Sequence, residues 1–222
     1  MYIEFSFLID PCRPVTAVNI KPPQVIPRTR MERGDKSNTS YLEIYAHTGT
    51  HIDCPWHFNQ LGWRIHNFDI QHFVFENVLS IHIPREPWQP VEPEQLELYW
   101  EEIRHSDALL INTGFAARYR NQDISQYLDA TPGLSLDAAQ MLAEIHTLGC
   151  IGVDFTSIEN LNRNRPLGYP VHHALLGRVE PMILLEDANL EVLGHQSIRR
   201  IFLFPLRVVD LEASPVTAVA EI

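Results

Sequence analysis

Eleven residues, from His47 to His57, concentrate side chains that can bind a metal or move a proton. The run reads His-Thr-Gly-Thr-His-Ile-Asp-Cys-Pro-Trp-His, and it holds three imidazoles, His47, His51 and His57, and one carboxylate, Asp53. Imidazole and carboxylate groups are ligands for zinc, manganese, iron and cobalt. Because the chain has only 11 histidines in 222 residues, this clustering indicates a metal or catalytic site rather than chance.

The local sequence disfavours a helix at these residues. Two histidines four positions apart would suit one helix face, as in zinc proteases with an HExxH motif. Here, however, Thr48 stands where those enzymes carry glutamate, and Gly49 and Pro55 are poor helix residues. The run is therefore interpreted as extended chain.

On an extended strand, alternate side chains point the same way. We therefore expect His47, Gly49, His51 and Asp53 to share one face, with the glycine leaving room for an ion. The proline after Asp53 ends the pairing, so His57 lies off the strand. It is either a further ligand or a proton carrier beside the ion.

The run resembles the signature H-x-G-T-H-x-D-x-P-x-H of the cyclase-like metal-dependent hydrolases, a family that includes bacterial kynurenine formamidases and isatin hydrolases. Every fixed position is matched. The resemblance implies that His47, His51 and Asp53 bind one divalent metal and that Asp53 can bridge to a second. It also implies that His57 donates and accepts a proton, and that each subunit holds one or two ions, zinc or manganese.

Further blocks similar to the family follow in the same order, at 108–115, 132–135, 151–158, 172–176, 184–190 and 213–216. By this resemblance, His172 and Glu186 complete a second metal site, with His173 as a competing ligand. Glu186 also follows the apolar run 182–185, and a carboxylate at the end of a buried strand needs a partner. A cation or a nearby arginine would serve.

Residues 1–40 depart from the family, in which a Pro-Gly-Asp turn follows a Pro-Val-aromatic stretch. This chain has Pro14-Val-Thr16 and then Lys21-Pro-Pro. The resemblance implies that this segment shapes the pocket and the oligomer contacts, so the exact substrate stays open.

Composition predicts one domain spanning 1–222, because 222 residues that are 45% hydrophobic can bury a sizeable core. No apolar run reaches the roughly 20 residues of a membrane span, and no basic signal sequence precedes the core, so we expect a cytoplasmic protein. The net charge of -11 argues against nucleic acid as a partner. Three widely spaced cysteines predict no disulfide framework, and Cys54 is interpreted as a packed thiol.

Apolar or alternating runs predict strands at 3–9, 41–46, 78–83, 108–111, 151–153, 182–185 and 201–209. Helices are expected at 92–105 and at 136–148, the second with Ser135 as its N-cap and Gly149 past its end. The resemblance adds an α/β fold of the swivelling β/β/α type, with a barrel-like central sheet flanked by helices, assembled as homodimers or homotetramers.

A divalent ion with an open position lowers the pKa of its bound water towards about 7 and polarises a carbonyl. The sequence thus predicts a metal-dependent hydrolase of a small amide, similar to arylformamidases. The alternatives are a ring-opening hydrolase of a cyclic amide, imide or lactone, similar to isatin hydrolase, and a metal-dependent binding protein without turnover. Trp56, Phe58 and Trp63 flank the motif, either as an aromatic substrate pocket or as core residues.

Overall fold

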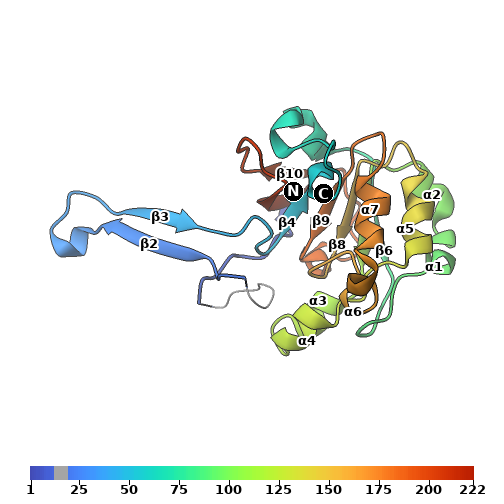
Figure 1. Cartoon of the computed structure of the whole chain (residues 1–222), viewed down its shortest axis with the longest axis horizontal. Coiled ribbons are helices and arrows are strands. Elements are labelled where there is room, and N and C mark those ends of the chain that lie inside the picture. The colour runs from blue at the N-terminus through green and yellow to red at the C-terminus, as the bar shows by residue number, and fades with distance from the viewer. Residues whose placement is uncertain (13–19) are drawn as a thin grey trace.

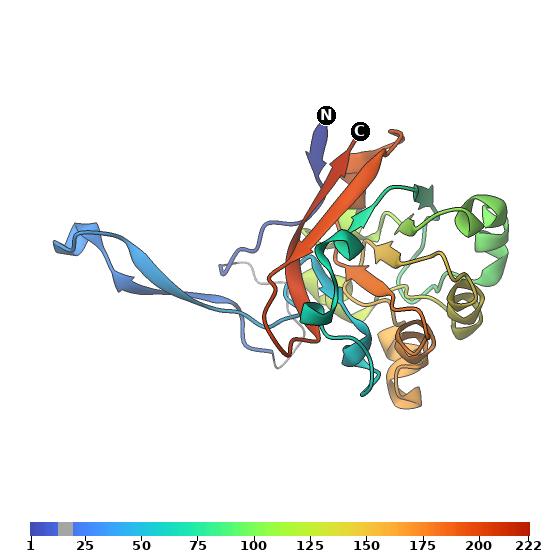
Figure 2. The same cartoon turned by 90° about the horizontal axis from the view of Figure 1, so that it is seen from above.

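The centre of the molecule is a nine-stranded sheet, and the computed structural model describes residues 1–12 and 20–222. The strands follow the order β5-β10-β11-β4-β9-β8-β7-β6, with β1 beside β11 (Figures 1 and 2). Their bounds are β1 Tyr2–Glu4, β4 His51–Asp53, β5 Val74–Phe75, β6 Val78–His82, β7 Ala108–Asn112, β8 Cys150–Val153, β9 Ile183–Glu186, β10 Arg200–Pro205 and β11 Ala213–Glu221.

The sheet has a parallel half and an antiparallel half. Strands β6, β7, β8 and β9 are parallel, while β5, β10 and β11 pair antiparallel. Strand β4 lies between the halves and runs antiparallel to both β11 and β9. The short strand β4, which carries the middle of the histidine motif, is therefore held on both edges.

Two hydrophobic cores lie on opposite faces of the parallel half. In β7, Leu109 and Ile111 belong to one core and Ala108 and Leu110 to the other, as the two-residue period of a strand requires. Every residue of β7 is buried. This arrangement explains why the strand reads as a continuous apolar run rather than an alternating one.

In the described residues, seven short α-helices accompany the sheet, several of them lying over one face of its parallel half (Figure 1). They are α1 Pro93–Glu97, α2 Trp100–Arg104, α3 Phe115–Tyr119, α4 Ile124–Asp129, α5 Leu136–Ala143, α6 Leu161–Asn164 and α7 Pro170–Leu176. The expected α/β fold, with a barrel-like central sheet flanked by helices, is confirmed.

Several elements differ in length from the sequence prediction. The helix expected at 92–105 is two helices, α1 and α2, because the backbone of Tyr99 leaves the helical region at φ -123° and ψ 17°. The helix expected at 136–148 begins as predicted, with Ser135 accepting a hydrogen bond from the Ala138 amide. It ends at Ala143, and the apolar pattern continues because Ile145 and Leu148 remain buried in the core after the helix stops.

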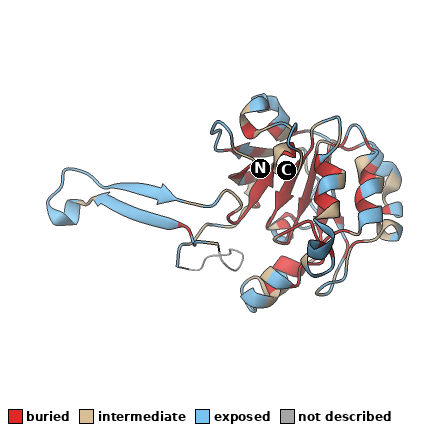
Figure 3. Ribbon diagram, in the orientation of Figure 1, coloured by how far each residue is buried: buried red, intermediate tan, exposed pale blue. Residues whose placement is uncertain are grey.

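The strands expected at 3–9, 41–46 and 201–209 are also shorter or shifted, and correspond to β1, β3 and β10. Strands β2 Gln24–Thr29 and β3 Thr39–Glu43 form a separate hairpin that extends away from the rest of the molecule (Figures 1 and 2). All of its strand residues are exposed except the partly buried Thr29 (Figure 3). The segment Pro14–Thr16 lies outside the described residues. Within the described part of the chain, no helix is long and apolar enough to cross a membrane.

Candidate metal centre and active site

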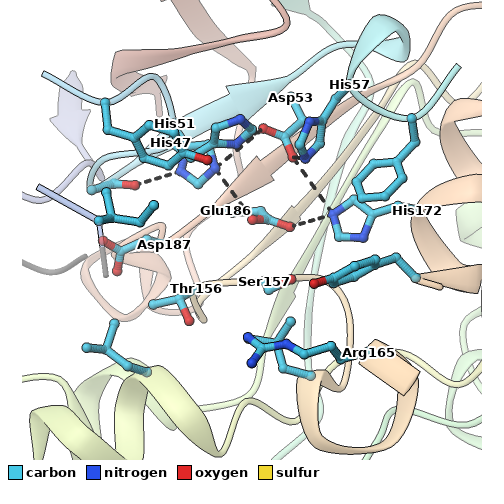
Figure 4. A pocket seen from close by; sticks show the side chains of 17 residues that line it. His47, His51, Asp53, His57, Thr156, Ser157, Arg165, His172, Glu186 and Asp187 are labelled. Atoms are coloured by element: carbon cyan, nitrogen blue, oxygen red, sulfur yellow. Dashed lines mark hydrogen bonds and ion pairs between the residues drawn. The ribbon is translucent and has the colours of Figure 1, made fainter. Parts of the chain in front are cut away.

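A buried cluster of histidines and carboxylates forms where β4 meets β9. In the register of this pair, His51 lies directly opposite Glu186, and opposed residues of antiparallel strands place their side chains on the same face. Asp53 is two residues after His51 and so shares that face. The Nε2 atom of His51 lies 3.5 Å from Glu186 Oε2 and 3.4 Å from Asp53 Oδ1 (Figure 4).

The prediction that His47 and Gly49 continue this strand is wrong. Strand β4 begins at His51, and Gly49 has φ +64°, a left-handed conformation that turns the chain. A Cβ at Gly49 would also lie 3.2 Å from Ile9 Cγ1. The turn nevertheless folds His47 back over the strand, so that its Nδ1 atom lies 2.8 Å from Asp53 Oδ1. Proximity of His47 to Asp53 thus arises from a turn rather than from strand alternation.

His57 closes the near side of the cluster. It ends a short 3₁₀-helix, Pro55–His57, in which Pro55 occupies the first turn, as expected for a residue with a fixed φ and no backbone N–H. The His57 Nε2 atom is 3.7 Å from Asp53 Oδ2. His57 therefore leaves the line of β4 but stays beside the same carboxylate.

Helix α7 supplies the opposite side through His172. Its Nε2 atom lies 3.8 Å from Asp53 Oδ2 and 3.5 Å from Glu186 Oε1. His173 is exposed and its ring contacts Phe58 edge-on. The structure thus brings His172, rather than His173, to the cluster.

Three of the four histidines have one ring nitrogen fixed by an acceptor outside the cluster. His51 Nδ1 lies 2.8 Å from the Gly49 carbonyl, and His172 Nδ1 lies 3.3 Å from Glu159 Oε1. His47 Nε2 lies 3.3 Å from Glu212 Oε1. Such contacts fix the tautomer and the ring orientation of metal-binding histidines, leaving the other nitrogen free to bind an ion.

His57 differs from these three histidines. No hydrogen bond to its Nδ1 atom is found within residues 1–12 and 20–222, and its side chain keeps 25% of its exposure. A ring that is not held by a second acceptor can turn and exchange a proton with solvent or substrate.

Asp53 carries the clearest sign that a cation belongs here. It is 1% exposed, and neither carboxylate oxygen has a hydrogen-bond donor in suitable alignment within the described chain, although His47 is close. His51 Nε2 is likewise buried without a partner. Buried charges are normally paired or bind metals. The side chains therefore fit a divalent ion, in two groups that share Asp53: His47, Asp53 and His57, and His51, Asp53 and Glu186.

Glu186 has no arginine partner in the described part of the chain. Its Oε1 atom accepts a hydrogen bond of 2.7 Å from the Ile158 amide, and His51 and His172 approach its two oxygens. Burial alone would raise the pKa of this carboxyl, but the two histidines outweigh burial and lower it. The structure thus places Glu186 among groups that could hold a metal ion, and no arginine among the described residues pairs with it.

The charges of the cluster shift the histidine pKa values in opposite directions. Burial alone would lower the pKa of His172, but Glu159 and Glu186 raise it to about 9. Burial would also lower the pKa of His47, but Asp53 and Glu212 outweigh burial and raise this pKa to about 11. At His57, burial dominates and the pKa is lowered. His57 is thus the member of the cluster most easily kept neutral near pH 7.

The cluster lies in the wall of a cavity of about 390 Å³. Phe58 lines this cavity and stacks on His172, with ring centroids 4.6 Å apart. Trp56 and Trp63 do not line it: Trp56 packs beneath the Arg64 guanidinium, and Trp63 packs against Phe68. Of the three aromatic residues that the sequence offered for a substrate pocket, only Phe58 lines the cavity, while Trp63 is exposed.

Two carboxylates that the sequence prediction missed hold the cluster from outside. Glu159 is fully buried and also accepts a hydrogen bond of 2.6 Å from Asn164 Nδ2, while Glu212 approaches His47. Neither belongs to the histidine motif, and their only sequence signal is a position next to matched blocks. Cys54 is a buried thiol whose Sγ lies 3.0 Å from the Glu212 carbonyl, and burial raises its pKa to about 12, as expected for a packed thiol.

Comparisons with known proteins agree on one family. The family model described as "Putative cyclase" matches residues 6–160. The kynurenine formamidase of Bacillus cereus (strain ATCC 10987 / NRS 248) is 29% identical over 188 residues, which cover 85% of this chain and 82% of that protein.

Two solved structures share the fold. Isatin hydrolase A from Labrenzia aggregata, bound to benzyl benzoate, matches with a TM-score of 0.82 and 20% identity over 99% of this chain and 93% of that one. An isatin hydrolase bound to the product analogue thioisatinate matches with a TM-score of 0.83 and 17% identity, covering 100% and 92% of the two chains. With the family model matching well over half of the chain, and with the histidine motif folded around one carboxylate, the protein belongs to the cyclase family.

Proposed function

We propose that this protein is a metal-dependent hydrolase that cleaves the carbon–nitrogen bond of a small aryl amide, as an arylformamidase does. The observation that carries the proposal is Asp53, a buried carboxylate that four histidines surround and that has no aligned donor on either oxygen among the described residues. The similarity to proteins named kynurenine formamidase supports hydrolysis of a carbon–nitrogen bond.

The proposed ligands of the principal metal are His47, His51 and Asp53, and those of a second metal are His172 and Glu186. Asp53 lies within 3.8 Å of the nearest ring nitrogen of each histidine, which supports its role as the shared ligand. A zinc or manganese ion held there would lower the pKa of a bound water and polarise a carbonyl. The number of ions per subunit and the cytoplasmic location stay predictions.

The protein's own groups supply the remaining chemistry. His57 accepts a proton from the attacking water and donates one to the leaving nitrogen, because its lowered pKa keeps the ring neutral and its Nδ1 is unheld. The Glu159 and Glu212 carboxylates orient His172 and His47. Phe58 and Tyr169, whose ring centroids are 5.5 Å apart, offer an apolar surface to an aryl group at one side of the cavity.

A ring-opening hydrolase remains the second candidate, since solved isatin hydrolases share the fold and a cyclic aryl amide needs the same proton transfers. The test is a hydrolysis screen with the protein loaded with zinc or manganese, over N-formyl aromatic amines, isatin-like rings, imides and lactones. We expect the highest kcat/KM on an N-formyl aromatic amine, with loss of turnover on chelation and recovery when metal is restored. Faster opening of the rings would favour the second candidate, and no turnover on any compound would overturn the proposal.

We further propose that residues 1–222 form one domain that assembles as a homodimer or homotetramer through its N-terminal segment. The β2–β3 hairpin supports this, because a lone two-stranded hairpin is marginally stable in water. It nevertheless exposes Val25, Met31, Tyr41 and Leu42 on its strands and tip, more apolar surface than an isolated arm would retain. Light scattering tests the assembly: we expect at least a dimer, and a Tyr41→Glu, Leu42→Glu variant that shifts towards monomer.

A further inference from the structure

The cavity has a cationic side chain on the wall opposite the histidine cluster. Among the described residues that line the cavity, Arg165 is the only arginine or lysine. It opens the 3₁₀-helix Arg165–Leu167 that follows α6, and its side chain extends towards Thr156 and Ser157 (Figure 4). This cation therefore faces the space in which a substrate would lie.

Arg165 has no carboxylate partner within the described part of the chain. No ion pair or hydrogen bond joins its guanidinium to another residue there, although Asp129 lies across a neighbouring hollow. Arg163, two residues earlier, instead approaches Glu92 at 4.0 Å and lies outside the cavity. Of these two arginines, only Arg165 lines the cavity, and its guanidinium donors have no partner within the described residues.

The position of Arg165 is fixed by the same carboxylate that orients His172. The preceding residue, Asn164, is buried and donates to Glu159 Oε2 at 2.6 Å, while Glu159 Oε1 contacts His172 Nδ1. The backbone of Gly168, at φ +77°, closes the turn by donating to the Arg165 carbonyl. One buried carboxylate thus ties the cationic wall to the catalytic wall.

The charges of the lining leave this cation uncompensated. The described lining carboxylates are Asp53, Glu186 and Asp187. Arg120 pairs with Asp187 at 3.0 Å, and a divalent ion would neutralise Asp53 and Glu186. Arg165 then adds one positive charge to the cavity, which favours a ligand with one negative charge.

An unpaired cation opposite the histidine cluster favours a substrate with a negative group at its far end. We propose that Arg165 is a specificity-determining residue that binds a carboxylate carried by the substrate, at the side of the aryl group away from the scissile amide. This inference rests on the proposed function, since it assigns the other end of the same substrate. Arg–carboxylate pairs are planar and bidentate, so they fix orientation as well as affinity.

The test compares an aryl formamide that bears a side-chain carboxylate with the same compound in which that carboxylate is a primary carboxamide. Arg165→Gln is expected to raise KM for the carboxylate compound roughly tenfold, an effect moderated because Arg165 is exposed. The carboxamide should change by less than about threefold, and Arg165→Lys should recover part of the loss. Arg163→Gln is the matched control and is expected to behave as wild type on both compounds.

A binding measurement separates this inference from the proposed function. Calorimetry measures how tightly the metal-loaded protein binds two aryl-amine products, one with the carboxylate and one with the carboxamide. This comparison needs no turnover. If Arg165→Gln weakens binding of the carboxylate product but not of the carboxamide, the inference is supported even when neither formamide is cleaved. Absence of cleavage would overturn only the proposed function. Equal binding of both ligands by wild type and Arg165→Gln overturns the inference even if formamides are cleaved.

Discussion

The two sides of the histidine–carboxylate cluster, called here the near wall and the far wall, are assembled in different ways. The near wall is one continuous stretch, His47 to His57, which turns at Gly49, pairs as β4 and turns again at Pro55. The far wall takes His172 from α7, Glu186 from β9 and Glu159 from the chain between β8 and α6. Asp53 is common to both, because groups from each wall approach its oxygens. The near wall is thus a local property of the sequence, whereas the far wall depends on strand register and helix packing.

Replacing Asp53 tests the point that the walls share, and it should have the largest effect. Asp53→Asn keeps the size of the side chain but removes the charge needed by both ligand groups. We expect loss of bound metal and a fall in kcat/KM of about 1,000-fold or more, since metal catalysis supplies several kcal/mol. Metal content by mass spectrometry and formamide kinetics measure both quantities.

Asp69→Asn is the matched control for Asp53→Asn, because it makes the same chemical change at an exposed carboxylate outside the cavity lining. It should retain metal and most activity. Full metal occupancy with normal kcat/KM in Asp53→Asn would show that this carboxylate does not join the walls.

His57 tests the near wall alone. His57→Ala removes the one cluster ring without a second acceptor, so we expect a roughly 100-fold or greater loss of kcat with the metal retained. Because a poor amine leaving group needs a proton more than a phenolate does, the defect should shrink on an activated ester. His51→Ala, which removes a ring held by Gly49, should instead lose metal. A His57→Ala protein without metal, or equally slow on amide and ester, would make His57 a ligand or a structural residue.

The difference between the walls explains what the sequence could predict. The signature from His47 to His57 is short, so residue spacing alone identified its three histidines and its aspartate, although only 51–53 of the expected strand forms. His172 was found only through resemblance to the family, whereas Glu186 was also indicated by its position after the apolar run 182–185. In the fold, Glu186 reaches His51 because β4 and β9 pair in one register, and no local pattern encodes that pairing.

Glu159 and Arg165 show where prediction from sequence stops. They are the first and last residues of a polar stretch, 159–165, in which the sequence predicts neither a strand nor a helix. Their importance depends on Glu159 being fully buried between Asn164 and His172, which is a consequence of packing. The buried strands, in contrast, were predicted well because β7, β8 and β9 are continuous apolar runs whose length matches a short parallel strand.

Glu159 tests the far wall alone, with an intermediate effect. Glu159→Gln keeps a group able to hold Asn164 but removes the negative charge beside His172 Nδ1. We expect a roughly 10- to 100-fold loss of activity or of affinity for the second metal, as for carboxylates that orient metal-binding histidines. Asn164→Ala, which breaks the other contact of the same carboxylate, should change thermal stability without this loss. Equal losses in the two variants would mean that Glu159 acts only in folding.

The smallest effect concerns the pH dependence of stability in the metal-free protein. In the folded chain the pKa of His172 is about 9, above the ordinary value near 6.5. The protonated ring therefore contributes stability that is fully present below about pH 6.5 and is lost as pH rises through 9. His47, with a pKa of about 11, extends the same trend to higher pH. Bound metal requires neutral imidazoles, so it should weaken the trend.

Thermal unfolding at pH 6.5 and pH 9, with a chelator and with saturating metal, measures how the stability of the two forms depends on pH. We expect the metal-free protein to lose a few degrees in Tm between the two pH values, and the metal-loaded protein to lose less. His172→Gln should flatten the metal-free decline, because the far wall then has no ring to deprotonate in this range, while the exposed His173→Gln should not. If both variants decline as wild type does, the ion pairs of His172 with Glu159 and Glu186 contribute nothing to folding. The two walls would then differ only in how they hold the metal.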